Sequence, residues 1–229
     1  MLQSETIGNL NQFDLFSTLN EKTLDKFKPY IFSRTYKKNQ YLFMEGDPRD
    51  KIFFLQEGYV MFEIGNEEGS MLYLDFVKHD QMFPLAGFFN DKYYQHTAIA
   101  VTDIKVYFIQ VKVLEEMVKS NPKLLMNIIT KLSVVLSSHQ KRVQKIVIPN
   151  AQDRVLHSLQ FLMEDLGEKD GNEIIIPCPL TASKISKISG TTRETVSLLM
   201  NQLKKENIIS VCEKKIRIHN PQYFEDAFH

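Results

Sequence analysis

The sequence predicts an α+β protein with three parts: an N-terminal β-roll of the jelly-roll type, a long helix, and a C-terminal winged helix-turn-helix. Three observations carry this prediction. Short apolar runs alternate with polar turns between residues 30 and 109, a helical repeat continues from 122 to 146, and two short helical patterns flank a glycine at 190. We place the three parts at residues 1–120, 121–148 and 149–229.

The first part begins with an amphipathic stretch from Leu10 to Lys28, which we expect to be helical, with Asn20 or Ser17 as its cap. Runs rich in Tyr, Phe, Ile and Val follow, separated by turns that contain Gly, Pro, Asn or Asp. Many short strands at such spacing are typical of a jelly roll or barrel. The expected strands are 31–36, 40–44, 52–56, 59–64, 71–77, 97–101 and 105–109.

A helix is expected at 112–119, and Pro122 fits the first turn of the long helix after it. Apolar residues recur in the long helix at alternating spacings of three and four, which indicates a coiled-coil-like seam. The repeat comprises Leu125, Ile128 or Ile129, Leu132, Val135 or Leu136, His139, Arg142 or Val143, and Ile146. We predict dimer contacts from Leu125, Ile128, Leu132, Val135 and Ile146. In the alternative, the helix packs on its own domain.

The third part begins with a helix from Asn150 or Ala151 to Gly167, and Pro149 separates this helix from the long one. Its inward residues are expected to be Val155, Leu159 and Leu162. A charged loop is predicted at 168–172 and a strand at 173–178.

A helix-turn-helix is predicted from Leu180 to Leu203. Thr181 caps the first helix, Gly190 ends it, and Thr191 with Glu194 has the spacing of a capping box for the second. The second helix carries an apolar stripe of Val196, Leu199 and Leu203. Two further runs, 208–212 and 216–218, flank a charged turn and predict the hairpin of a wing.

This motif places the N-terminal residues of its second helix against base edges in the major groove of DNA. Arg193 matches guanine O6 and N7, Glu194 can accept from the cytosine amino group, and Ser197 can reach a base or a phosphate. The alternative is that Glu194 only caps the helix and Arg193 is only solvated. The predicted DNA contacts are Thr181, Ser183, Thr192, Arg193, Glu194, Ser197, Asn201 and Lys214.

Charge supports this interpretation locally, although the whole chain has a net charge of zero. Residues 181–219 hold eight basic and three acidic side chains, a local net charge of +5. Binding to phosphates needs a basic face and not a basic protein. No apolar run approaches the ~20 residues of a membrane span, and the N-terminus lacks a signal-peptide pattern. We therefore expect a cytoplasmic protein without a membrane partner, whose Cys178 and Cys212 are buried free thiols.

The run Gly190-Thr191-Thr192-Arg193-Glu194-Thr195-Val196-Ser197 closely resembles the recognition helix of the CRP/FNR family, and 45–47 with 52–60 resembles its cyclic-nucleotide-binding β-roll. The resemblance covers nearly the whole chain. It implies a homodimeric transcription regulator, an activator, that binds a palindromic operator and RNA polymerase. It also implies base-reading roles for Arg193 and Glu194. The family has a second arginine immediately after Ser197, where this chain has Leu198. Leucine does not read guanine but can touch a thymine methyl.

The sensor region departs from the family pattern. Cyclic-nucleotide binders of the family hold the ribose with a Gly-Glu pair and the phosphate with an Arg-Ser pair. Here 83–89 contains no Glu, 93–98 contains no Arg, and no arginine lies between Arg49 and Arg142. A buried phosphate without its guanidinium loses a charge-assisted pair, so cyclic AMP is not expected to bind in the usual way. An effector pocket would draw on Phe83, Leu85, Gly87, His96, Thr97, His139 and Gln140.

Other chemistries find no support. An iron–sulfur sensor needs several cysteine thiolates, and the first 177 residues contain none. His79 and His96 are isolated rather than clustered as metalloenzyme ligands are, so we expect no metal, no cofactor and no enzymatic activity. Two hypotheses stay open, a small-molecule sensor and a constitutively active DNA-binding dimer whose roll is a scaffold or a protein-docking module. The departures resemble Gram-positive members of the family, including regulators of the arginine deiminase operon, which suggests targets in arginine catabolism or anaerobic metabolism.

Overall fold

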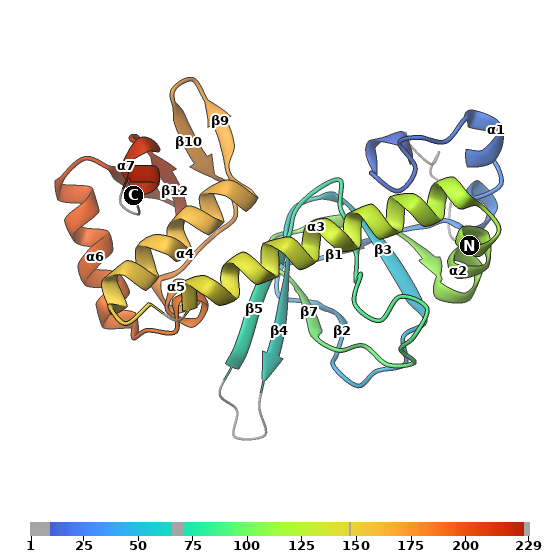
Figure 1. Ribbon diagram of the computed structural model, residues 1–229, viewed down its shortest axis with the longest axis horizontal. Coiled ribbons are helices and arrows are strands. Elements are labelled where there is room, and N and C mark those ends of the chain that lie inside the picture. Colours follow the sequence, from blue (N-terminus) through green and yellow to red (C-terminus); the bar gives the residue numbers. More distant parts are fainter. Residues whose placement is uncertain (1–9, 66–70, 147, 227–229) are drawn as a thin grey trace. The chain divides into compact units, whose positions relative to one another are not determined.

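The computed structural model describes residues 10–65, 71–146 and 148–226 and is drawn in Figure 1. The chain forms two compact units. One comprises Met1–Ile64 and Phe76–Leu136, and the other comprises Gly65–Asp75 and Ser137–His229. Across the parts of the chain that the structure describes, no helix has both the length and the apolar character needed to cross a bilayer.

The N-terminal segment is a series of single turns and not the continuous helix that the sequence predicts for residues 10–28. It contains η1 (Leu10–Gln12), α1 (Glu21–Leu24) and η2 (Lys28–Tyr30). Asn20 caps α1 as expected, because its Oδ1 accepts from the amide of Thr23 at 3.0 Å. The turns bring Phe13, Phe16 and Phe27 into one buried cluster, and this packing outweighs the weak helical pattern.

Two antiparallel four-stranded sheets form the β-roll, and the expected β-roll fold is confirmed. In the first sheet the order is β1 (Phe32–Tyr36), β8 (Ile104–Gln110), β3 (Lys51–Glu57) and β6 (Met82–Phe83). In the second it is β2 (Tyr41–Phe43), β7 (Thr97–Ala100), β4 (Val60–Gly65) and β5 (Met71–Val77). The seven expected strands are all present. Only β6 is missing from the prediction, because two residues are too short for a pattern of alternation.

Aromatic rings fill the space between the two sheets. Phe43 stacks on Tyr94 with ring centroids 3.8 Å apart, and Phe53 stacks on Phe83 at 5.4 Å. Burial of its hydroxyl raises the pKa of Tyr94 well above its usual value, and that hydroxyl donates to the carbonyl of Lys51 at 3.0 Å. Stacked rings of this size supply much of the apolar area that holds the roll together.

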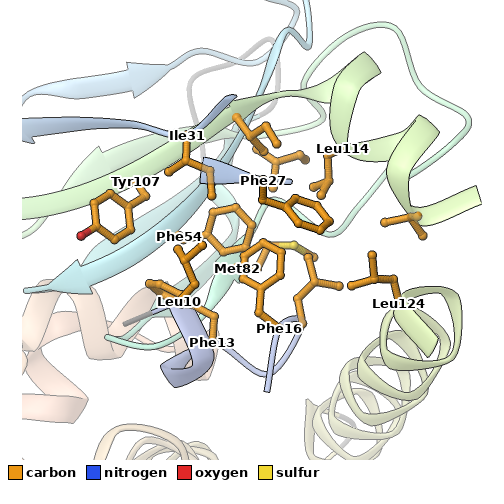
Figure 2. Packing of buried hydrophobic residues seen from close by; sticks show 14 of the residues in the cluster. Leu10, Phe13, Phe16, Phe27, Ile31, Phe54, Met82, Tyr107, Leu114 and Leu124 are labelled. Carbon is orange, nitrogen blue, oxygen red and sulfur yellow. The ribbon is translucent and has the colours of Figure 1, made fainter. Parts of the chain in front are cut away.

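A second apolar cluster covers the outside of the roll, and Figure 2 shows its packing. Helix α2 (Val111–Lys119) and the first half of α3 (Pro122–Ile146) pack against it. Ile128 of α3 is only 1% exposed within this cluster. Its neighbour Asn127 donates to the carbonyl of Leu15 at 2.9 Å, and Lys131 forms an ion pair with Asp14 at 2.8 Å. One face of the helix therefore packs on its own unit, as the alternative interpretation held.

The predicted seam is consequently wrong at Ile128, which belongs to the core. Leu125 also packs partly against that cluster, and Val135 is only half-buried. The side chain of Ile146 lies outside the described residues. Another face of α3 carries a set of exposed apolar side chains, which follow one another at spacings of three, four and seven residues. We call it the α3 stripe, and it comprises Ile129, Leu132, Leu136 and Val143.

The C-terminal part begins with α4 (Ala151–Leu166), whose Val155, Leu159 and Leu162 are buried as expected. A four-stranded antiparallel sheet follows. Its order is β11 (Ile209–Cys212), β12 (Lys215–Ile218), β10 (Glu173–Ile176) and β9 (Glu168–Asp170). The prediction of a loop at 168–172 is wrong, because β9 pairs with β10 although its side chains are all charged. A short helix, α7 (Gln222–Asp226), follows this sheet in the sequence.

The two cysteines differ in their surroundings. Cys178 is buried as expected, and burial raises the pKa of its thiol to about 12. Cys212 is exposed, so the prediction that it is buried is wrong. It ends strand β11 next to the wing turn, and the last three residues of this strand are exposed.

Candidate nucleic-acid interface

The helix-turn-helix consists of α5 (Ala182–Ser189) and α6 (Arg193–Lys205). Thr181 caps α5 as predicted, because its hydroxyl oxygen accepts from the amide of Lys184 at 3.2 Å. Gly190 ends the helix in the left-handed region, with a φ of 59° that glycine adopts without strain. The tight turn therefore arises from the residues that the sequence analysis assigned to it.

The cap of α6 is Thr192 and not Thr191. The Thr192 hydroxyl oxygen accepts from the amide of Thr195 at 3.2 Å. Thr191 instead closes the end of α5, because its amide donates to the carbonyl of Ser186 at 3.0 Å. The predicted capping box between Thr191 and Glu194 is thus wrong by one residue.

Helix α6 has one buried face and one exposed face. The predicted stripe of Val196, Leu199 and Leu203 is buried. Arg193, Glu194, Leu198 and Asn201 are exposed, and Ser197 is half-buried. Packing of the stripe fixes the helix on its unit, and this leaves the polar side chains of its first two turns directed away from the core.

Glu194 lies in the first turn of α6, where the backbone carries unpaired N–H groups. Hydrogen bonds that its carboxylate accepts, first from its own backbone amide and then from the side chain of Thr192, lower the pKa of its carboxyl group. The side chain is therefore a carboxylate at neutral pH. An exposed carboxylate at this point is an acceptor that is fixed close to the helix start.

The wing is the hairpin of β11 and β12, joined by Glu213 and Lys214. Both turn residues have positive φ, 51° and 67°, which is the conformation of a tight two-residue hairpin turn. The carbonyl of Lys214 accepts from the amide of Leu180 at 2.8 Å. This bond holds the exposed Lys214 close to the start of α5, where Thr181 and Ser183 lie.

Arg217 is one of the eight basic residues between 181 and 219, but two acidic partners offset its positive charge. Its Nη1 pairs with Asp170 at 2.7 Å and with Glu173 at 2.8 Å, and these partners raise its pKa. Glu173 also bonds His219 Nδ1 at 2.7 Å. Among residues 181–219, the exposed basic side chains are those of Lys187, Arg193, Lys204, Lys205, Lys214 and Lys215.

One residue that supports this site, Arg154, belongs to no pattern in the sequence that predicts its role. Arg154 of α4 donates to the carbonyls of Ser189 at 3.2 Å and Gly190 at 3.3 Å, at the end of α5. Its Nη1 also donates to the carbonyls of Ile148 at 2.9 Å and Pro149 at 3.0 Å. Partners 35 and 36 residues distant cannot be found from local patterns. We refer to this set of bonds as the Arg154 clamp.

Comparison with known families agrees with this geometry in both parts of the chain. The profile described as the cyclic nucleotide-binding domain matches residues 33–121. The profile described as the Crp-like helix-turn-helix domain matches residues 153–227, which include α4, α5, α6 and the wing. The chain belongs to the CRP/FNR family.

Relatives along most of the length support the assignment to CRP/FNR. The chain is 26% identical over 211 residues to the global nitrogen regulator of Nostoc sp., covering 90% of this chain and 93% of that protein. It is 27% identical over 208 residues to the HTH-type transcriptional regulator ArcR of Staphylococcus epidermidis, covering 90% of each. The structure of FixK2 from Bradyrhizobium japonicum shares the fold, with a TM-score of 0.75, 18% identity, and coverage of 86% and 96%.

As a member of the CRP/FNR family, the chain is a DNA-binding transcription regulator. All the predicted DNA-contacting residues lie on α5, α6, their caps or the wing. The turn joins the end of α5 to the start of α6, and the bond between Leu180 and Lys214 joins the wing to the start of α5.

The residues predicted for an effector pocket in this CRP/FNR protein lie in different surroundings, and the pocket itself stays a prediction. Phe83 is buried between the sheets, whereas Leu85 packs against the outer cluster. Gly87 lies in a turn with a φ of 74°, and a Cβ there would lie 2.3 Å from a carboxylate oxygen of Asp91. Thr97 accepts from the amide of Glu45 at 3.1 Å.

The remaining residues predicted for the effector pocket are His96 and, on α3, His139 and Gln140. The ring of His96 lies 4.7 Å from the ring of Phe62, which in turn lies 5.9 Å from the ring of Phe83. His139 and Gln140 belong to the C-terminal portion of α3, which clusters with the second unit. Phe62 thus links the rings of Phe83 and His96 in one contact series.

Proposed function

We propose that this regulator binds an inverted-repeat operator as a homodimer and activates transcription. The proposal rests chiefly on one observation, which is the exposed Arg193 and Glu194 at the capped start of α6 above a fully buried apolar stripe. In a helix-turn-helix this end of the second helix enters the major groove.

Each exposed side chain supplies a different interaction with DNA. The planar guanidinium of Arg193 offers two parallel donors for guanine O6 and N7. The ionised carboxylate of Glu194 accepts from the cytosine amino group and disfavours bases that present acceptors. Ser197 and Asn201 lie further along the helix and can reach a base or a phosphate.

Contacts to phosphate hold the protein in register on the duplex. Lys214 at the wing tip, Thr181 and Ser183 at the start of α5, and Thr192 at the start of α6 offer charged or hydroxyl donors. Each helix start adds unpaired backbone amides and a positive dipole end. Such contacts release counterions, so binding is expected to weaken steeply as salt rises.

Dimerisation is proposed through the α3 stripe. Exposed apolar residues at spacings of three and four are the pattern of a coiled-coil seam, and in water their burial against a second copy is favourable by about 25 cal/mol per Å². A two-fold dimer matches an inverted repeat whose half-sites lie about one helical turn apart.

A second candidate concerns the roll. It is a constitutively active dimer whose roll is a scaffold or protein-docking module, and the observation behind it is the mutual packing of the Phe62, Phe83 and His96 rings. The other hypothesis for the roll is a small-molecule sensor. Thermal-shift titration with nucleotides and metabolites separates the two. Stabilisation linked to a ligand supports the sensor, and its absence at millimolar concentrations supports the scaffold.

Contact with RNA polymerase, activation, and targets in arginine catabolism or anaerobic metabolism remain predictions from the family resemblance. Transcription with purified polymerase on a bound promoter tests the first two. A genome-wide map of bound DNA tests the third.

Selection from a randomised duplex library with the full chain tests the core of the proposal. We expect enrichment of an inverted repeat with half-sites about 10 base pairs apart, centre to centre. Enrichment of no sequence, or of a single unrepeated site, would contradict the proposed mode of binding.

A further inference from the structure

Leu198 is a large apolar side chain on the polar outer face of α6. Its exposed fraction is 64%. In α-helical geometry it shares that face with Glu194, one turn before it, and with Asn201, three residues after it. The apolar stripe of the same helix is buried without it, so Leu198 is not part of the packing that holds α6 on its unit.

The isolation of Leu198 argues against a protein partner at this point. Among described residues between 148 and 224, the other large apolar side chain that is exposed is Val211, at 36%. A stable protein interface buries about 800 Å² on each partner around an apolar centre. One leucine between an exposed carboxylate and an exposed amide cannot provide such a centre.

The chemistry of the DNA major groove offers one apolar group for such a side chain. Thymine presents its C5-methyl there, whereas the edges of guanine, adenine and unmethylated cytosine present hydrogen-bonding groups without a methyl. Leucine can neither donate to guanine nor accept from cytosine. A base pair that meets Leu198 gains stability only if the base carries this methyl group.

We propose that Leu198 contacts the C5-methyl of a thymine and thereby specifies a T·A pair in each half-site. The inference rests on the proposed DNA-binding function of α6. Four residues of helix advance about 6 Å, and base pairs are spaced about 3.4 Å apart. The thymine is therefore expected about two base pairs from the pair that Glu194 contacts.

Replacing thymine by deoxyuridine tests the proposal, because the replacement removes only the methyl group. Each thymine of the selected operator, together with its symmetry mate, is replaced in turn. Gel-shift titration with the full chain is expected to show a loss of about fourfold at one thymine position per half-site, the effect of one buried methyl. In Leu198→Ala this position becomes insensitive to the replacement. Gln202→Ala, which changes a neighbouring polar side chain, keeps the sensitivity.

The outcomes separate this inference from the proposed function. If the selected operator is bound specifically but no thymine is sensitive, the inference is wrong and the proposed function stands. The same holds if Leu198→Ala keeps the sensitivity of wild type to the loss of the methyl group. If no operator is enriched, the proposed function fails and the inference fails with it. Repeating the selection with Leu198→Arg is expected to replace the thymine by guanine at that position.

Discussion

The guanidinium of Arg154 donates to the carbonyl oxygen of Gly190 at 3.3 Å, and so joins the first turns of α4 to the turn of the helix-turn-helix. The other bonds of the Arg154 clamp reach Ser189 and the two residues before α4, Ile148 and Pro149. One cation thus satisfies carbonyls at the end of α5 and in the segment that follows α3. Both the stability of this unit and the position of α6 are expected to depend on it.

Arg154→Ala is expected to destabilise the C-terminal unit by about 2–3 kcal/mol, because it removes charge-assisted bonds and leaves partly buried carbonyls unpaired. DNA affinity is expected to fall as well, since the turn before α6 loses its support. Chemical denaturation and gel shift measure the two effects. For the stability measurement Arg193→Ala is the matched control, because it removes an exposed arginine that makes none of the described hydrogen bonds or ion pairs. Equal stability of the two variants would show that the clamp contributes nothing.

Arg193→Ala is expected to weaken operator binding by about 1–3 kcal/mol and to relax the preference for guanine at one position. Lys214→Ala, by contrast, is expected to weaken operator and scrambled duplexes alike and to reduce the salt dependence by about one phosphate contact. Gel shifts at several salt concentrations distinguish these patterns. If Arg193→Ala leaves the discrimination between the two duplexes unchanged, its proposed base-reading role is wrong.

Leu132→Asp is expected to weaken dimerisation by about 2–4 kcal/mol, because it places a charge in an apolar contact. Val134→Asp is the matched control. Val134 is more exposed than Leu132, at 61% against 38%, and lies outside the α3 stripe. Analytical ultracentrifugation should show dissociation in the first variant only. Equal masses for both variants would contradict the assignment of the stripe.

Glu173 is expected to make stability depend on pH in the acid range. Hydrogen bonds from His219 and then Arg217 lower the pKa of its carboxyl group below the ordinary value of 4.5. The folded state therefore binds this proton less tightly than the unfolded state does. The stabilisation is complete above the unfolded pKa and is lost as pH falls through the folded pKa.

Melting temperatures measured from about pH 6 to pH 3 test this expectation. Glu173→Gln should show a smaller decrease on acidification than wild type. Glu164→Gln, which changes an exposed carboxylate on α4, should follow wild type. A Glu173→Gln profile parallel to that of wild type would show that the network has no such role.

Local signals explain why the helix-turn-helix was predictable from sequence. Thr181, Gly190 and the buried stripe of α6 act within a few residues of each other, and each is where the sequence analysis placed it. The cap of α6 was misassigned by one residue because Thr191 and Thr192 both suit a cap. Only the structure shows that the amide of Thr191 is used at the end of α5.

Longer-range packing explains the remaining differences. Helix α3 has apolar residues on two faces, so periodicity alone could not tell that Ile128 enters the core while Ile129 stays exposed. Strand β9 is charged throughout and is held by pairing with β10, which leaves no pattern in its own residues. The Arg154 clamp depends on contacts across 35 and 36 residues and has no local signature.

Light scattering on the full chain mixed with its selected operator tests the central claim most directly. The account predicts a complex of two chains on one duplex, and a large loss of affinity when one half-site is scrambled. A complex of one chain per duplex, or equal affinity for the intact and half-scrambled sites, would contradict it.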